Sequence, residues 1–442
     1  MPTLEDFWPT RAAVSSTSWR DSDYFISAKE YVEEAVNFVK SDRFMRGVVI
    51  GTGVVLAAGS VAASYLWTSV PDGMYPEDRW AVRRIYARNQ WAGLLAKIGV
   101  KLGLGKPWDL HRRFRDPPIV KPKRTNTNIF VEHLQFDGVS VVLYRKNLYN
   151  LRASSNDLAD SRPAIVHIYG GGWCFSTSET YEAHHRLLTE KLNAAILTID
   201  YRKSPEHPFP AGFNDCYNAI RYFYEHAEEF GVDPARISIL ADSAGGNIAA
   251  GVTLKIRDEA LGLTLKSQLL IYPCTQFMNF RTNSYLSTVP LLQAEQMAMF
   301  AALYAGEKPP KIAAGMLQNY HFSKDFQENP GWQALKRYAH HVTIFEAIAT
   351  DYLAFQRKAL NPYMCPLMAA NLKGLPPTLV MICQFDVLKD DALAFMDRLQ
   401  FDGVPVGLKV YPGPHGTFRS FEELKVGREM MHDVIEYFRG HM

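Results

Sequence analysis

The sequence predicts an α/β protein with a mostly parallel central sheet, helices on both of its faces, and a membrane-spanning helix in the amino-terminal part. From about residue 131 onward, short apolar runs alternate with amphipathic stretches longer than ten residues. Two long segments rich in helix formers and aromatic residues, 71–125 and 275–360, do not follow this alternation. A third observation is a run of twenty-four residues, 47–70, that contains no charged side chain.

Seven short apolar runs are the predicted strands of the sheet. They are residues 139–144, 164–168, 195–199, 237–240, 268–272, 378–382 and 406–411. The stretches between them carry apolar residues at i, i+3 and i+4, the spacing of one helix face. The predicted helices are residues 180–192, 213–229, 247–259 and 388–402.

The uncharged run 47–70 is long enough to cross the ~30 Å hydrocarbon core of a bilayer as a helix. A buried core helix is the alternative, but such helices rarely stay uncharged beyond about 18 residues. A cleaved signal peptide fits less well, because the run begins after residue 46 and lacks a small-residue cleavage pattern. Arg46 adjoins the run directly, whereas Arg79 lies nine positions beyond its end. The positive-inside rule therefore favours a cytosolic amino terminus and a luminal carboxyl-terminal part.

Four regions follow from these patterns: a juxtamembrane segment 1–46, the anchor 47–70, a first cap segment 71–125, and a catalytic domain 126–442. The insertion at about 275–360 is the second cap segment. We expect the two cap segments to cover the carboxyl edge of the sheet, where open α/β sheets bind ligands. Ordinary peripheral helical clusters are the alternative. Gly47 and Gly51 have the small-xxx-small spacing that allows two anchors to pair into a homo-oligomer, although glycine is also common in lipid-facing spans.

The composition excludes an electrostatically driven partner. Lys and Arg total 48 against 46 for Asp and Glu, so no net charge draws the chain to nucleic acid. A lipophilic small molecule, reached at the lipid bilayer, is the expected partner. We expect no cofactor, because the glycine run 170–172 is followed neither by the Lys-Ser/Thr pair of a phosphate-binding loop nor by a G-x-G-x-x-G pattern that opens a helix. We also expect no metal, because no histidine spacing matches a metal site.

Ser243 is the candidate nucleophile. It lies in Ala241-Asp242-Ser243-Ala244-Gly245, directly after a predicted strand and before a predicted helix. The small residues at positions 241 and 245 permit the tight turn that exposes a nucleophilic serine. The five-residue motif alone is weak evidence, and its place between strand and helix gives it weight.

A serine hydroxyl needs a base and an orienting carboxylate, which follow it in the order Asp, His in one group of hydrolases. Asp386 and His415 each follow a predicted strand, 378–382 and 406–411 respectively. Asp390 and Asp391 are alternatives for the carboxylate, but they fall inside the next predicted helix. For the oxyanion that forms during acyl transfer, we expect donors in Gly170, Gly171, Gly172 and the backbone amide of Ala244.

From about residue 125 to its end, the chain resembles the hormone-sensitive-lipase-like α/β-hydrolases, and within them the arylacetamide deacetylase and neutral cholesterol ester hydrolase branch. The motifs that carry the resemblance are Tyr169-Gly170-Gly171-Gly172-Trp173-Cys174, Tyr201-Arg202-Lys203-Ser204-Pro205-Glu206-His207-Pro208-Phe209-Pro210-Ala211, Asp242-Ser243-Ala244-Gly245-Gly246-Asn247, and Asp386-Val387-Leu388-Lys389-Asp390-Asp391. The resemblance implies the catalytic roles above, a helical cap, and one amino-terminal anchor in the endoplasmic reticulum membrane with a luminal active site.

The chain departs from that family at two positions and has one implied covalent feature. The family usually has histidine where this chain has Tyr169, and glycine where it has Ala241. Similar members of the branch join the positions of Cys174 and Cys383 by a disulfide, which a luminal compartment permits. Free buried thiols are the alternative.

These observations favour a membrane-anchored serine hydrolase that cleaves lipophilic esters or aryl acetamides through an acyl-enzyme. The competing hypothesis is a membrane-anchored binding or trafficking protein that keeps the fold without turnover, because a fold alone does not determine function.

Overall fold

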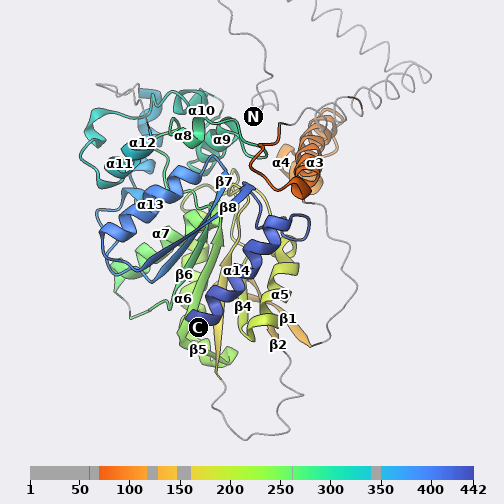
Figure 1. The fold of residues 1–442 in the computed structure, drawn as a ribbon, viewed down its shortest axis with the longest axis vertical. Coiled ribbons are helices and arrows are strands. Elements are labelled where there is room, and N and C mark those ends of the chain that lie inside the picture. The colour runs from red at the N-terminus through yellow and green to blue at the C-terminus, as the bar shows by residue number, and fades with distance from the viewer. Residues whose placement is uncertain are drawn as a thin grey trace, which may run out of the picture.

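The computed structural model describes residues 59, 69–116, 128–146, 161–260, 262–309, 311–339 and 350–442. Within them lies an eight-stranded sheet of order β1-β2-β4-β3-β5-β6-β7-β8, with helices on both faces (Figure 1). The six strands from β4 to β8 in this order pair in parallel, whereas β2 is antiparallel to both of its neighbours. The predicted, mostly parallel α/β sheet is confirmed.

Seven of the strands coincide with the predicted apolar runs, and one was missed. The bounds are β1 Ile129–Phe136, β2 Val139–Lys146, β3 Arg162–Ile168, β4 Ala195–Ile199, β5 Val232–Asp242, β6 Gln268–Ile271, β7 Thr378–Phe385 and β8 Val406–Pro414. The missed strand, β1, lies at the edge of the sheet, and Phe136 is its one buried residue. Asp137 and Gly138 link it to β2 with φ of 50° and 81°, a two-residue turn that Asp-Gly pairs favour.

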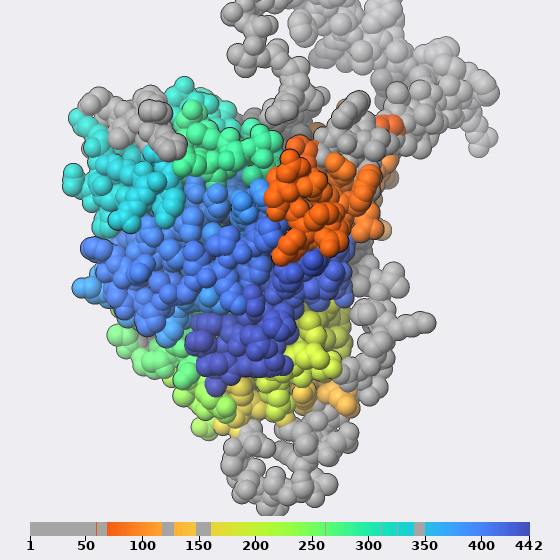
Figure 2. All heavy atoms as spheres, in the orientation of Figure 1, coloured from red at the N-terminus to blue at the C-terminus, as the bar shows by residue number. Residues whose placement is uncertain are grey.

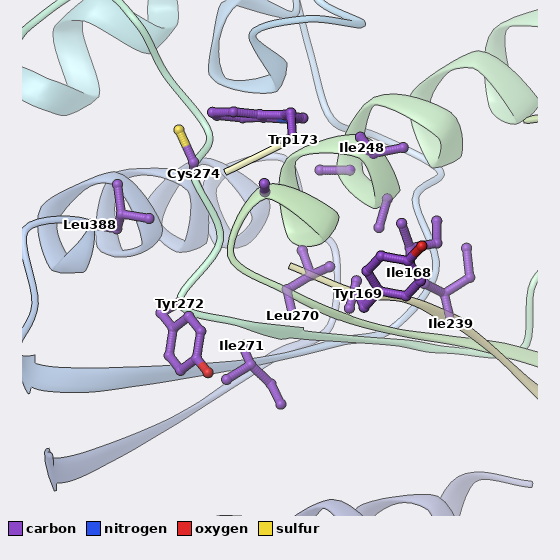
Figure 3. Packing of buried hydrophobic residues seen from close by; sticks show 14 of the residues in the cluster. Ile168, Tyr169, Trp173, Ile239, Ile248, Leu270, Ile271, Tyr272, Cys274 and Leu388 are labelled. Carbon is purple, nitrogen blue, oxygen red and sulfur yellow. The ribbon is translucent and has the colours of Figure 1, made fainter. Parts of the chain in front are cut away.

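Helices cover the two faces of the sheet as the alternation predicts. On one face lie α5 (Glu182–Leu192) and α14 (Lys425–His441), and on the other lie α6 (Ala211–Glu225), α7 (Ala244–Glu259) and α13 (Lys389–Phe401) (Figure 1). Figure 3 shows Leu270 pointing toward Ile248 of α7, whereas its neighbour Ile271 points to the opposite face. Strands with both faces buried are apolar throughout, which explains why they stand out as continuous apolar runs.

The two segments outside the alternation are helical. The first holds α3 (Pro76–Lys101) and α4 (Pro107–Arg115), and the second holds α8 (Asn283–Leu286), α9 (Ala294–Tyr304), α10 (Lys311–Met316), α11 (Pro330–Leu335) and α12 (Leu353–Ala359). Both groups lie at the end of the sheet where the parallel strands finish (Figure 1).

The first segment is fixed to the carboxyl-terminal helix α14 by a buried carboxylate. Asp78 of α3 accepts hydrogen bonds from the backbone amides of Lys425 and Val426, at 2.6 and 3.0 Å, and is 2% exposed. It therefore caps the amino end of α14, whose first amides have no partner inside the helix. Tyr75 adds a hydrogen bond to Glu429 at 3.0 Å. Figure 2 shows this segment packed against the carboxyl-terminal residues.

The predicted anchor, residues 47–70, lies outside the described residues except for Gly59, Ser69 and Val70, and so do residues 1–46 and the Gly47/Gly51 pair. In the described part of the chain, none of the helices combines the length and apolar character that crossing a membrane requires.

Replacing Asp78 with alanine should lower the free energy of unfolding by about 1–2 kcal/mol, because the amino end of α14 loses its cap and the charge that favours its dipole. The midpoint of urea unfolding measures this. Glu77→Ala is the matched control, since Glu77 is exposed and pairs with the Lys425 side chain at 3.4 Å instead of with the backbone amides that Asp78 binds. A shift for Glu77→Ala as large as that for Asp78→Ala would contradict the capping role.

Candidate active site

Ser243 lies in the sharp turn between β5 and α7. Its φ and ψ are 55° and −122°, a strained conformation for a residue with a side chain. Gly245 makes this turn feasible: a Cβ at that position would lie 2.0 Å from the carbonyl oxygen of Ile168 at the end of β3. The sharp strand-to-helix turn predicted from the sequence is thus present, and it holds Ser243 at the amino end of α7.

The structure brings Ser243, His415 and Asp386 together. The hydroxyl of Ser243 lies 2.9 Å from Nε2 of His415, and Nδ1 of His415 lies 2.8 Å from Oδ2 of Asp386. Because an ionised carboxylate only accepts hydrogen bonds, Nδ1 carries the proton and Nε2 accepts from the serine. The other oxygen of Asp386 accepts from the amide of Leu388 at 2.8 Å, so this 1% exposed carboxylate is fixed on both sides.

The alternative carboxylates have other partners. Asp390 accepts from the amide of Ser284 at 2.7 Å, and Asp391 accepts from Gln276 at 2.7 Å and from Tyr285 at 3.3 Å. Both therefore tie α13 to the chain that follows β6. Burial raises the pKa of Asp391 well above its usual value.

The glycine loop after β3 is positioned by the residue that precedes the serine. The amide of Gly170 donates to Oδ1 of Asp242 at 3.0 Å, and the hydroxyl of Tyr181 donates to Oδ2 at 2.9 Å. Gly170 is therefore not free to donate to an oxyanion, which corrects its place among the predicted donors. The other predicted donors, Gly171, Gly172 and Ala244, line one cavity together with Ser243.

Tyr169, where the similar family has histidine, is held in a polar contact away from this cavity. Its hydroxyl donates to Asp200 at 2.6 Å and accepts from Lys203 at 3.1 Å. Its ring stacks between those of Tyr181 and Tyr201, with centroids 5.7 and 5.2 Å away. Burial and Asp200 raise the pKa of Tyr169 well above its usual value. Tyr169 thus fixes the start of the glycine loop through contacts on the side away from the cavity.

The cavity has a volume of about 120 Å³. Its floor is the catalytic turn and the His415 loop, and its walls come from the two helical segments. Residues that represent each wall are Ile85 of α3, His111 and Arg115 of α4, Met297 and Phe300 of α9, and Leu292 before α9. The side chain of Arg112 fixes α4 against the loop by donating to the carbonyl of Cys174 at 2.7 Å.

Basic side chains predominate among the charged groups around the cavity. Arg88 pairs with Glu423 at 3.1 Å, and Arg419 pairs with Asp116. Arg115 lines the cavity as well, with its guanidinium 4.3 Å from the centre of the Phe175 ring. Burial and the nearby Arg115 lower the pKa of the cavity residue His111 to about 4, so this histidine is neutral near pH 7.

The implied disulfide between Cys174 and Cys383 is contradicted, because all five cysteines are free and buried. Cys174 follows β3 and Cys383 lies in β7, and β5 and β6 separate these strands in the sheet. Burial raises the pKa of Cys174 to about 12, so the thiol stays protonated.

Comparisons with known proteins agree with this geometry. A family model described as alpha/beta hydrolase fold matches residues 165–330 and 314–419, more than half of the chain. The chain therefore belongs to the α/β-hydrolase fold family.

Its relatives confirm the branch that the motifs indicated. Arylacetamide deacetylase of Bos taurus is 31% identical over 407 residues, covering 88% of this chain and 98% of the relative. Neutral cholesterol ester hydrolase 1 of Rattus norvegicus is 30% identical over 392 residues, covering 82% and 92%. Among solved structures, an esterase of Pyrobaculum calidifontis shares the fold, with a TM-score of 0.57, 23% identity, and coverage of 83% of this chain and 98% of that one.

Three residues of the site were not predicted from the sequence. Asp242 is part of the serine motif, and its position directly before Ser243 was the signal that could have indicated a role in the site. Tyr181 and Arg115 reach the site from a short helical turn and from α4, and no local pattern distinguishes them from other aromatic or basic residues.

Stability should depend on pH because burial lowers the pKa of several histidines. Burial lowers the pKa of His184 to about 3 and of His321 to about 4, and lowers that of His185 well below its usual value. The unfolded chain binds protons at these residues below about pH 6.5, whereas the folded chain does not. The free energy of unfolding should therefore fall from about pH 7 toward pH 4, by up to about 1.4 kcal/mol per pH unit for each histidine.

Urea unfolding at pH 7.5, 6.5 and 5.5 measures this slope. His321→Asn should make the slope shallower, because one of the groups with a lowered pKa no longer titrates. An equal slope in the wild type and the variant would show that His321 is protonated in the folded protein.

Proposed function

We propose that this chain is a serine hydrolase that cleaves lipophilic carboxylic esters, or aryl acetamides, through an acyl-enzyme on Ser243. The observation that carries the proposal is the contact of Ser243 with His415 at 2.9 Å and of His415 with Asp386 at 2.8 Å, on the wall of a cavity. The names of the relatives, an arylacetamide deacetylase and a neutral cholesterol ester hydrolase, support the same chemistry.

Each residue has a defined step in this mechanism. Nε2 of His415 takes the proton of Ser243 as the serine oxygen attacks the substrate carbonyl. The same imidazole then gives that proton to the leaving alcohol or amine, and a water molecule repeats the sequence to release the acid. Asp386 holds the imidazole in its reactive tautomer and stabilises the imidazolium. The amides of Gly171, Gly172 and Ala244, with the amino end of α7, stabilise the negative charge on the former carbonyl oxygen.

The cavity favours a short acyl group. At about 120 Å³ it is smaller than the roughly 300–1,000 Å³ of sites that enclose drug-sized ligands. We propose that α3, α4 and α9 act as a cap whose side chains set this volume. A bulky alcohol or amine then extends out of the cavity while the small acyl group lies at Ser243.

We also propose that residues 47–70 anchor the enzyme in the endoplasmic reticulum membrane, with the catalytic domain in the lumen. The charge-free length of this segment supports the anchor. Exposed apolar side chains at the end of α3 offer a second contact with a bilayer. Among them, Leu102 and Leu104 are each 68% exposed, and Ile98 is 41% exposed.

A binding protein without turnover is the second candidate, and Tyr169 at the position of the family's histidine is the observation that favours it. A fluorophosphonate probe, which reacts with activated serines, separates the two candidates. Labelling of the wild type supports the enzyme, and absence of labelling in a folded wild-type protein supports the binding protein.

Ser243→Ala should abolish both probe labelling and ester turnover. Asp386→Asn should lower kcat by about 10³–10⁴-fold, because an amide at this position no longer holds the imidazole of His415 in its reactive tautomer. Hydrolysis of 4-nitrophenyl acetate by the purified full chain measures both. Asp391→Asn is the matched control, since Asp391 is also buried but contacts Gln276 and Tyr285 instead of His415. If Asp391→Asn loses as much activity as Asp386→Asn, the assignment of the carboxylate is wrong.

Deleting residues 47–70 should release the protein from membranes. In cells that express the full chain, the wild type should stay in the pellet after alkaline carbonate extraction, because a spanning helix is not removed by high pH. Recovery of the wild type in the supernatant would contradict the anchor.

A further inference from the structure

We propose that the substrate carries an anionic group, a carboxylate or a phosphate, and that Arg115 binds this group inside the catalytic cavity. The inference rests on the proposed hydrolysis and adds one feature of the substrate. Arg115 is the last residue of α4 and lines the same cavity as Ser243 and His415. A group bound to its guanidinium would thus belong to a molecule whose ester lies at the serine.

Among the described residues, Arg115 has no carboxylate that accepts a hydrogen bond from it, unlike the other cavity arginines. Arg88 pairs with Glu423 and Arg419 pairs with Asp116. In the described structure the guanidinium of Arg115 has no hydrogen bond or ion pair, and its Nε is fully buried without an acceptor. Its one contact of note is with the face of the Phe175 ring. A ring face attracts a cation but accepts none of its hydrogen bonds in the way that a carboxylate does.

The nearby carboxylates are already engaged. Asp116 accepts from Arg419 with Oδ1 and from the amide of Ser176 with Oδ2, at 2.9 Å for the latter. Asp242 uses both oxygens for Gly170 and Tyr181. Among the described residues around the inner end of α4, two guanidinium groups therefore share the charge of one carboxylate, and that of Arg115 makes no hydrogen bond with it.

Burial and the charge of Arg419 lower the pKa of Arg115 to about 10, so the group remains protonated near pH 7. His111, its cavity neighbour, is neutral there and supplies no counter-charge. A partly buried charge without a partner destabilises a fold, because it loses hydration without compensation. An anion from the substrate would supply that compensation. The planar fork of a guanidinium binds carboxylate and phosphate groups through two parallel hydrogen bonds.

Three small acetyl esters test the inference on the full chain. They are 4-acetoxybenzoate and 4-acetoxyphenyl phosphate, which are anionic, and methyl 4-acetoxybenzoate, which is neutral. The readout is kcat/KM for acetate release, expressed as the ratio of each anionic ester to the neutral one. That ratio should fall by about tenfold or more in Arg115→Met, because a charge-assisted pair is lost. In Arg115→Lys, which keeps the charge without the fork, the ratio should fall less.

Arg113→Met is the matched control, because Arg113 lies on the exposed side of the same short helix and should keep the wild-type ratio. The anionic ester with the higher wild-type ratio identifies carboxylate or phosphate as the preferred group. An unchanged ratio in Arg115→Met would overturn the inference. So would an equal loss for all three esters, which would assign Arg115 to the oxyanion or to the fold.

A binding measurement keeps this inference separate from the proposed reaction. Benzoate or phenyl phosphate should raise the midpoint of thermal unfolding of the wild type and of Ser243→Ala, but not that of Arg115→Met. Without ligand, Arg115→Met should be at least as stable as the wild type, since it removes an unpaired charge. If no ester is hydrolysed but these shifts appear, the reaction is wrong and the anion site stands. If esters are hydrolysed but neither anion stabilises the wild type, the anion site is wrong.

Discussion

The close approach of α7 to the end of β3 is the constraint on which the site depends. A helix can begin directly after Ser243 only because position 245 has no side chain to meet the carbonyl of Ile168. The same approach places Asp242 within hydrogen-bond distance of Gly170. Ser243 and the glycine loop are therefore held together, and His415 and Asp386 approach Ser243 from the ends of two neighbouring strands.

Much of the fold and the three central side chains could be predicted from the sequence for a physical reason. Strands buried on both faces are continuous apolar runs, and residues that follow parallel strands collect at one edge of the sheet. Ser243, Asp386 and His415 each follow a parallel strand, so their meeting follows from topology. The edge strand β1 was missed because one of its faces is exposed and its apolar alternation is weak.

The parts that could not be predicted depend on contacts between distant segments. Gly170 was expected to donate to the oxyanion, but whether an amide is free depends on Asp242, 72 residues later in the chain. The state of Cys174 and Cys383 likewise depends on the folded chain, in which both are free, buried thiols. Arg115 is one of several basic residues in α4, and only the cavity distinguishes it from its neighbours.

The contact between Asp78 and α14 has a consequence for how substrate arrives. It makes α3 a fixed wall of the catalytic domain, so the chain between the proposed anchor and that wall is only residues 71–75. A linker of this length spans at most about 20 Å even when fully extended. The start of α3 would thus stay within a lipid's length of the bilayer that holds the proposed anchor, so an ester that leaves the leaflet would have only a short distance to cover before it meets the domain that carries Ser243.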